Sequence, residues 1–170
     1  ELETHGGSLR VFARHADGAP PASDAVARVL ASEESAGLHT VEGHAGFETS
    51  VQAVKRDLMR FLLEAQEQGK SVVGYGAPGK GNTLLNYCGI KPDLIEFTVD
   101  RNHHKHGKFL PGSRIPVLDP DEIASATPDY VLVLPWNLRE EITAQLHYVA
   151  EWGGTLVYAI PRLAFVTPGA

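Results

Sequence analysis

Short apolar runs separated by helical segments dominate the chain from residue 70 onward. The runs lie at residues 71–75, 94–99, 115–118, 130–134 and 155–160, and the helical segments at residues 79–88, 119–124 and 138–150. The runs are dense in Val, Leu, Ile, Phe or Tyr, which is typical of strands buried on both faces of a sheet. Strands that alternate with helices predict an α/β fold, a Rossmann-like three-layer sandwich with a mostly parallel sheet flanked by helices.

The first part of the chain is more helical. Apolar and polar side chains alternate over residues 8–13, which predicts a half-buried strand. A helix is expected to follow a cap at Ser23 or Asp24 and to end by Gly37. The most regular helical spacing of apolar side chains covers residues 51–65 and predicts a long amphipathic helix.

Composition and charge narrow the classes of function. A chain of 170 residues suits one compact domain, and 43% apolar with 21% charged residues is typical of a globular protein. The net charge of −6 argues against binding to nucleic acid or to an anionic membrane, and no apolar run has the length of a membrane helix. Cys88 is the only cysteine, so we expect a reducing, cytoplasmic compartment. The first residue is Glu1 rather than Met, and we expect a segment of a larger protein.

A glycine-rich string offers the strongest candidate chemistry. Residues 74–79 match G-x-G-x-x-G through Gly74, Gly76 and Gly79, after a predicted strand and before a predicted helix. Glycines in this context allow a sharp turn and a close approach to phosphate, and the helix N-terminus offers unpaired N–H groups. The backbone around Gly76 and Ala77 is therefore a candidate anion site. The alternative is a tight strand-to-helix turn that only packs.

Polar side chains follow the string in the first turn of the predicted helix. Lys80 could add a cation, and Asn82 and Thr83 could add an amide and a hydroxyl, to the same site. The pattern G-x-x-x-x-G-K-[ST] is not matched, so a Walker P-loop is excluded.

Asp100 ends the next predicted strand. It lies 21 residues beyond Gly79, where a dinucleotide-binding fold places the carboxylate that accepts hydrogen bonds from ribose hydroxyls. The alternative is a solvated acid at a strand end. Together, Asp100 and the glycine string predict a nucleotide-like ligand at the carboxyl ends of the strands.

A polar loop follows Asp100. His103, His104 and His106 raise the question of a metal site, but no carboxylate or thiolate is interleaved with them, so we favour a ligand-facing loop and predict no metal. Asn102 and Lys105 are the members of this loop that we expect to contact base, ribose or phosphate.

Trp136 and Asn137 follow another predicted strand and reach the same edge of the sheet. Trp136 could stack on a ligand or pack on the sheet. The patterns G-x-S-x-G, H-E-x-x-H and C-x-x-C are missing, and we predict no catalytic residue in this chain.

A family resemblance rests on these same segments. Residues 74–90, Gly-Tyr-Gly-Ala-Pro-Gly-Lys-Gly-Asn-Thr-Leu-Leu-Asn-Tyr-Cys-Gly-Ile, closely resemble the C-terminal domain of sugar C-methyltransferases, S-adenosylmethionine-dependent enzymes that methylate ring carbons of nucleotide-linked deoxysugars. Similar stretches lie at residues 5–10, 98–107, 110–117, 134–138 and 152–154. Two positions depart from the family pattern: Gly79 stands where Ala is more usual, and His103 where Pro is usual.

The resemblance implies a three-part enzyme: an N-terminal zinc-binding module, a central domain that binds S-adenosylmethionine and carries the catalytic His and Tyr residues, and this C-terminal domain. Residues 1–16 would be a strand and linker leaving the absent catalytic domain, and residues 17–170 a domain that binds a dTDP-linked keto-deoxysugar. The glycine turn, Lys80, Asn82 and Asp100, together with Thr83, would line the substrate cleft. The implied reaction is loss of a proton beside the 4-keto group, followed by attack of the enolate on the methyl group of S-adenosylmethionine.

Under this interpretation S-adenosylmethionine binds outside the fragment, and the domain itself holds no cofactor. Its partners are the nucleotide-sugar and the upstream methyltransferase domain, and the isolated domain binds without turnover. Two other functions remain open. One is an NAD(P)-binding oxidoreductase domain, favoured by the glycine string with Asp100. The other is a non-catalytic Rossmann-like scaffold with an empty cleft.

Overall fold

The computed structural model describes residues 2, 7–18, 21 and 23–168. The chain divides into two compact units, Glu1–Gln52 and Ala53–Ala170, and the division falls inside helix α3 (Phe47–Glu67). The expected division into residues 1–16 and 17–170 stays a prediction.

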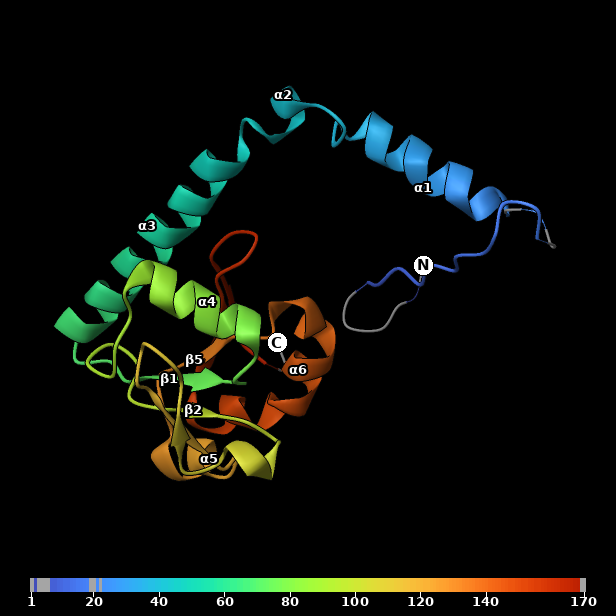
Figure 1. Ribbon diagram of the computed structural model, residues 1–170. Helices are drawn as coiled ribbons and strands as arrows, with labels where there is room; N and C mark the ends of the chain where they lie inside the picture. The colour runs from blue at the N-terminus through green and yellow to red at the C-terminus, as the bar shows by residue number, and fades with distance from the viewer. Residues whose placement is uncertain (1, 3–6, 19–20, 22, 169–170) are drawn as a thin grey trace. The chain divides into compact units, whose positions relative to one another are not determined.

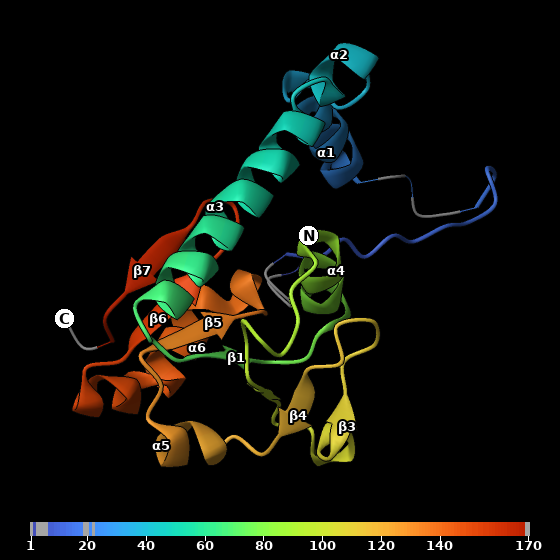
Figure 2. The same ribbon diagram turned by 90° about the vertical axis from the view of Figure 1, so that its left-hand side faces the viewer.

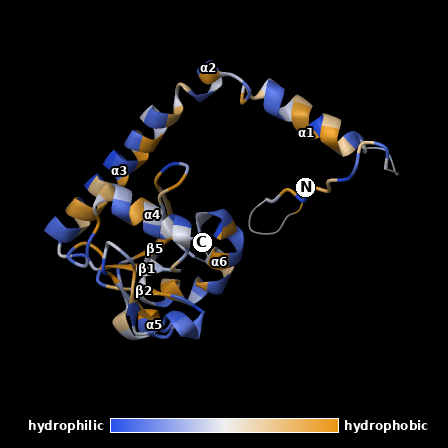
Figure 3. Cartoon of the chain, viewed as in Figure 1, coloured by the Kyte–Doolittle hydropathy of each residue, from blue (hydrophilic) through white to orange (hydrophobic). Residues whose placement is uncertain are grey.

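Helices form the first unit (Figure 1). They are α1 (Asp24–Ser35), α2 (Val41–His44) and the beginning of α3, and α1 confirms the expected first helix. The side chain of Thr40 caps α2 by accepting a hydrogen bond from the Gly43 N–H at 3.1 Å. None of the unit's described residues is buried, although α1 carries apolar positions among polar ones (Figure 3).

The strand expected over residues 8–13 is wrong. Ser8 belongs to an isolated antiparallel bridge with Leu2 rather than to a strand, and residues 9–13 form neither strand nor helix. Alternation supplies one apolar face, but a strand also needs a neighbour that pairs with its backbone N–H and C=O groups along its length. Leu9, Val11 and Phe12 are exposed. His5, in the segment of resemblance at residues 5–10, lies outside the described residues.

A seven-stranded sheet organises the described part of the second unit (Figure 2). Its strands are β1 (Val72–Tyr75), β2 (Thr98–Val99), β3 (Lys108–Phe109), β4 (Pro116–Leu118), β5 (Tyr130–Val133), β6 (Thr155–Tyr158) and β7 (Ala164–Val166). Their order across the sheet is β3-β4-β2-β1-β5-β6-β7. The five inner strands are parallel, and the edge strands β3 and β7 are antiparallel to their neighbours. The predicted α/β fold with a mostly parallel sheet is confirmed.

Helices cover both faces of this sheet. Besides α3 they are α4 (Gly79–Cys88), α5 (Glu122–Ala126), α6 (Arg139–Gln145) and the 3-10 helices η2 (His103–Lys105), η3 (Trp136–Leu138) and η4 (His147–Trp152). Val72 of β1 packs in one core cluster with residues of α3 and α4, whereas its neighbour Val73 packs in a second cluster with residues of α5, α6 and η4. Successive side chains of a strand point to opposite faces, so the sheet is the middle of three layers. Figure 2 shows α3 and α4 on one side and α5 on the other.

The order of the strands defines where a ligand has room to bind. The chain steps outward from β1 through β2 to β4, and then returns to the other side of β1 for β5 and β6. Open parallel sheets bind ligands outside the carboxyl ends of their strands, where the order reverses. Here that point lies beside β1.

The helices in the described part of the chain include none with the length and hydropathy of a membrane span.

Candidate functional site

Glycines shape the turn that leaves β1. Gly76 has a φ of +86°, and a Cβ added there would lie 2.6 Å from Cγ of Pro135. A Cβ on Gly74 would lie 2.6 Å from the hydroxyl oxygen of Thr98. Both positions therefore require glycine, because any side chain would collide with the neighbouring strand or loop.

The third position of the predicted string behaves differently. A Cβ on Gly79 would have no atom within 4 Å, whereas one on Gly81 would lie 2.8 Å from Cβ of Leu134. The close approach between helix and sheet thus occurs at Gly81. Packing within the described structure therefore requires glycine at position 81 and not at position 79.

The N-terminus of α4 points its free donors toward the turn. Pro78 precedes the helix with extended backbone, and no side chain in the described part of the chain caps this end. The first N–H groups of a helix lack partners within the helix and carry its positive dipole end, so an uncapped end can bind an anion. Two predicted side chains serve the helix itself: Thr83 donates to the Gly79 carbonyl at 3.1 Å, and Asn82 Oδ1 accepts from Asn86 at 3.2 Å.

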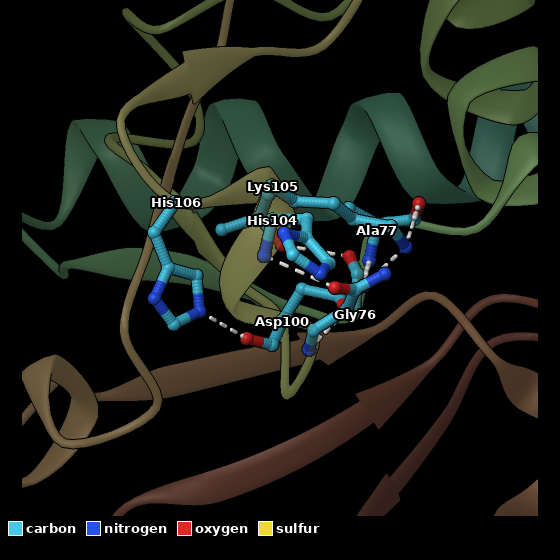
Figure 4. A network of polar contacts seen from close by, with 8 residues as sticks. Gly76, Ala77, Asp100, His104, Lys105 and His106 are labelled. Atoms are coloured by element: carbon cyan, nitrogen blue, oxygen red, sulfur yellow. Dashed lines mark hydrogen bonds and ion pairs between the residues drawn. The ribbon is translucent and has the colours of Figure 1, made fainter.

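Asp100 is the centre of a polar network that we name the Asp100 cluster: Ala77, Asp100, Asn102, Lys105 and His106 (Figure 4). Asp100 Oδ2 accepts from the Ala77 N–H and from Lys105 Nζ, each at 2.8 Å. Oδ1 accepts from the Asn102 N–H at 2.8 Å. Lys105 Nζ also donates to the Ala77 carbonyl at 3.1 Å. The carboxylate therefore ties the glycine turn after β1 to the loop after β2.

Electrostatics keep Asp100 ionised. Burial alone would raise the pKa of its carboxyl group, but hydrogen bonds from Lys105 and from the backbone N–H groups of Asn102 and Ala77 outweigh burial and hold the pKa below its ordinary value of 3.8. The side chain of Asp100 is 14% exposed and that of Lys105 is 38% exposed. The cluster thus presents a fixed ion pair at the rim of the site rather than two independent charges.

His106 joins the cluster through a contact with the backbone of Asp100. One ring nitrogen lies 2.6 Å from the Asp100 carbonyl oxygen, and the other lies 3.5 Å from a carboxylate oxygen of Asp119. The rings of His103 and His104 contact each other at a tilt of 43°, with centroids 3.9 Å apart. Among the described residues, no three His, Cys, Asp or Glu side chains are grouped so that they could hold a metal ion.

A second group of predicted residues meets on the other side of the turn, and we name it the Lys80 cluster: Lys80, Trp136 and Asn137. Lys80 Nζ donates to Oδ1 of Asn137 and lies 5.0 Å from the centroid of the Trp136 ring. A cation over an indole face is a favourable arrangement. The contact joins α4 to η3, which follows β5, so it spans the place where the strand order reverses.

The predicted site residues other than Asn82 and Thr83 therefore lie at one edge of the sheet. Two residues of this region could not have been identified from sequence spacing, because neither belongs to a recognisable motif. Pro135 packs against Gly76, and the carboxylate of Asp119 lies beside the ring of His106. The arrangement offers N–H donors and the Lys80 cation around one turn, with the Lys105 charge offset by Asp100, and it is suited to bind an anionic ligand. The part of each residue in binding a ligand stays a prediction.

Comparison with known proteins identifies the family of this chain. The family described as the C-methyltransferase C-terminal domain matches residues 3–161. The chain is 38% identical over 160 residues to the C-methyltransferase NovU of Streptomyces niveus, a match that covers 94% of this chain and 38% of that protein. The chain therefore belongs to the C-methyltransferase C-terminal domain family.

Proposed function

We propose that this chain binds the nucleotide-sugar substrate of an S-adenosylmethionine-dependent C-methyltransferase, a dTDP-linked keto-deoxysugar. The observation that carries the proposal is the uncapped N-terminus of α4 beside β1, with the Lys80 cluster on one side and the Asp100 cluster on the other. Such an end with adjacent cations suits a diphosphate. The family described above supports the link to methyl transfer.

Each cluster has a part in this proposal. The first N–H groups of α4 and Lys80 bind the diphosphate, and Trp136 and Asn137 hold Lys80 in position. Asp100 Oδ1 accepts only one hydrogen bond from the described residues, so it retains capacity for a sugar hydroxyl. Asn102 and Lys105 lie where they could reach the same ligand, and Gly74, Gly76 and Ala77 shape the backbone around it.

The chain's contribution to methyl transfer is positioning. Holding a ketosugar at fixed orientation lowers the barrier for proton removal beside the keto group and for attack on a methyl group. S-adenosylmethionine supplies that methyl group when it is bound, and we place its site and the catalytic base outside this segment. Residues 1–16 would connect the catalytic part to the binding domain. The single, buried Cys88 supports a cytoplasmic location.

A binding titration of this chain with dTDP tests the proposal. Lys80→Ala should weaken binding by about 10- to 100-fold, the loss typical of one hydrogen bond to a charged group. Lys91→Ala is the matched control, because Lys91 follows the opposite end of α4 and donates to the Gly112 carbonyl. Equal affinities of the original chain and Lys80→Ala would refute the phosphate role of Lys80.

A further inference from the structure

The first unit, residues 1–52, exposes a large share of the chain's apolar surface. Twelve large apolar or aromatic side chains are exposed in the described part of the chain, and eight of them lie in this unit, which holds less than a third of the residues. Their exposed fractions run from 51% to 85%. They are Leu9, Val11, Phe12, Val26, Leu30, Leu38, Val41 and Phe47. Because none of the unit's described residues is buried, these side chains do not form a core among themselves.

Helix α1 shows why this surface needs a partner. It has 12 residues and no buried side chain, and Ser23 at its N-cap makes no capping hydrogen bond with its side chain. A helix of this length is marginal in water unless tertiary packing covers one of its sides. Val26, Val29 and Leu30 lie three and four residues apart and share one side of the helix, which we name the α1 face. An apolar side of this kind is typical of a surface that contacts another protein segment.

Charge argues against a second copy of this chain as the partner. Residues 1–52 contain eight Asp or Glu residues, three Arg residues and no Lys. Two such units would bring like charges together on docking, which is unfavourable. A complementary surface instead combines apolar side chains with an excess of Lys and Arg.

The length of the relative indicates which segment supplies such a surface. The match to NovU covers 94% of this chain but 38% of that protein, so most of NovU lies outside the match. The matching family is described as a C-terminal domain, so a further part of such an enzyme precedes it. Residues 1–52 are the part of this chain that is nearest in sequence to a preceding part. Segments joined in one chain meet at a high effective concentration, so even a small apolar contact between them can form.

We propose that the α1 face docks on the part of the C-methyltransferase that precedes this domain, in an apolar groove bordered by Lys or Arg side chains. Docking gives α1 the burial that it lacks in this chain alone. The inference goes beyond the proposed function, because it assigns residues 1–52 to an interface between domains and requires no ligand. It rests on the family to which the chain belongs and not on nucleotide-sugar binding.

Hydrogen exchange of the α1 amides tests the proposal in two proteins, the enzyme with its preceding part and this chain alone. The amides should exchange roughly 10- to 100-fold more slowly in the enzyme, because docking covers the helix and suppresses its local opening. The double variant Val26→Asp with Leu30→Asp should abolish this protection in the enzyme. Ser32→Asp is the matched control, since it adds the same charge on the opposite side of α1 and should retain the protection.

Equal exchange of α1 in the enzyme and in this chain would overturn the proposal. Slow exchange in this chain alone would overturn it too, and a dependence of that exchange on protein concentration would show that a second copy covers the α1 face. A dTDP titration of this chain separates the two proposals, because the double variant should bind dTDP as the original chain does. If dTDP does not bind while α1 is protected in the enzyme, the proposed function is wrong and the interface stands.

Discussion

Two glycines of one sequence string have different physical roles. Gly76 combines a positive φ with a site for Cβ that Pro135 already fills, whereas Gly79 has negative φ and open space. The string G-x-G-x-x-G locates the turn but cannot separate these roles, because contact with Pro135 depends on how β5 and the loop after it lie against β1. Local spacing carries no information about a neighbour 59 residues away.

Gly76→Ala and Gly79→Ala should therefore differ in stability. We expect Gly76→Ala to lower the free energy of unfolding by about 1–3 kcal/mol, through backbone strain and collision with the Pro135 ring. Gly79→Ala should leave it unchanged or raise it by up to about 1 kcal/mol, since alanine suits a helix better. Urea denaturation measures both. Equal losses in the two variants would contradict the account of the turn.

Asp100 shows how far a residue's role could be predicted from the sequence. Its place directly after a strand is confirmed, its partners were not predicted, and its part in binding a ligand stays a prediction. The bonds to Ala77 and Lys105 depend on the turn geometry after β1 and on η2, a short 3-10 helix that no periodicity signals. The observed role of Asp100 is therefore structural: its carboxylate joins the turn after β1 to η2.

Asp100→Asn tests this tie through its pH dependence. The folded pKa lies below the ordinary 3.8, so the carboxylate's contribution to stability is present above that pH and is lost as the pH falls through the folded pKa. At pH 7 the variant should be less stable by about 2 kcal/mol, the scale of hydrogen bonds to a charged group. This difference should shrink below pH 4. Asp129, whose pKa is also lowered, remains in both proteins and cancels in the comparison. A difference independent of pH would contradict the role given to the charge.

For strands and helices, the degree of burial decides which ones can be predicted from the sequence. Strands β1, β5 and β6 and helix α4 lie where their patterns predict, because both faces of an inner strand must be apolar. The strand predicted over residues 94–99 lies at the right place in the chain, but the observed strand β2 is shorter and covers Thr98 and Val99. Edge strands β3 and β7 were not predicted. Each pairs on one side only, and Phe109 and Phe165 are exposed, so no buried pattern marks them.

The packing of helix α3 on the sheet can be tested by mutation of its buried and exposed faces. Phe61 is 8% exposed, and its ring contacts Tyr130 of β5 and Phe165 of β7 edge-on, with centroids 5.0 and 5.3 Å away. Phe61→Ala should lower the free energy of unfolding by about 3–5 kcal/mol. Leu63 on the same helix is 46% exposed, and Leu63→Ala should cost less than about 1 kcal/mol. Comparable losses at the two positions would show that α3 does not pack on the sheet through this face.

At the scale of the whole molecule, strand order brings the candidate site together. The alternation of strands and helices predicts a parallel sheet, and the reversal of strand order beside β1 brings the ends of β1, β2 and β5 to one edge. That edge gathers the Asp100 cluster and the Lys80 cluster from segments that lie up to 60 residues apart. A hollow on the other face of the sheet from α4 was not predicted, because its lining comes from β1, α5, α6, η4 and the loops after β2 and β4, which share no motif.

The most direct test of the central claim is a thermal-denaturation series on this chain with a dTDP-linked keto-deoxysugar, dTDP, NADH and S-adenosylmethionine. A ligand that binds the native state at 100 times its Kd should raise Tm by roughly 5–10 °C. If the proposed function is right, Tm rises with the two dTDP compounds and with neither NADH nor S-adenosylmethionine. A rise with NADH and none with the dTDP compounds would contradict it and favour a dinucleotide-binding oxidoreductase domain.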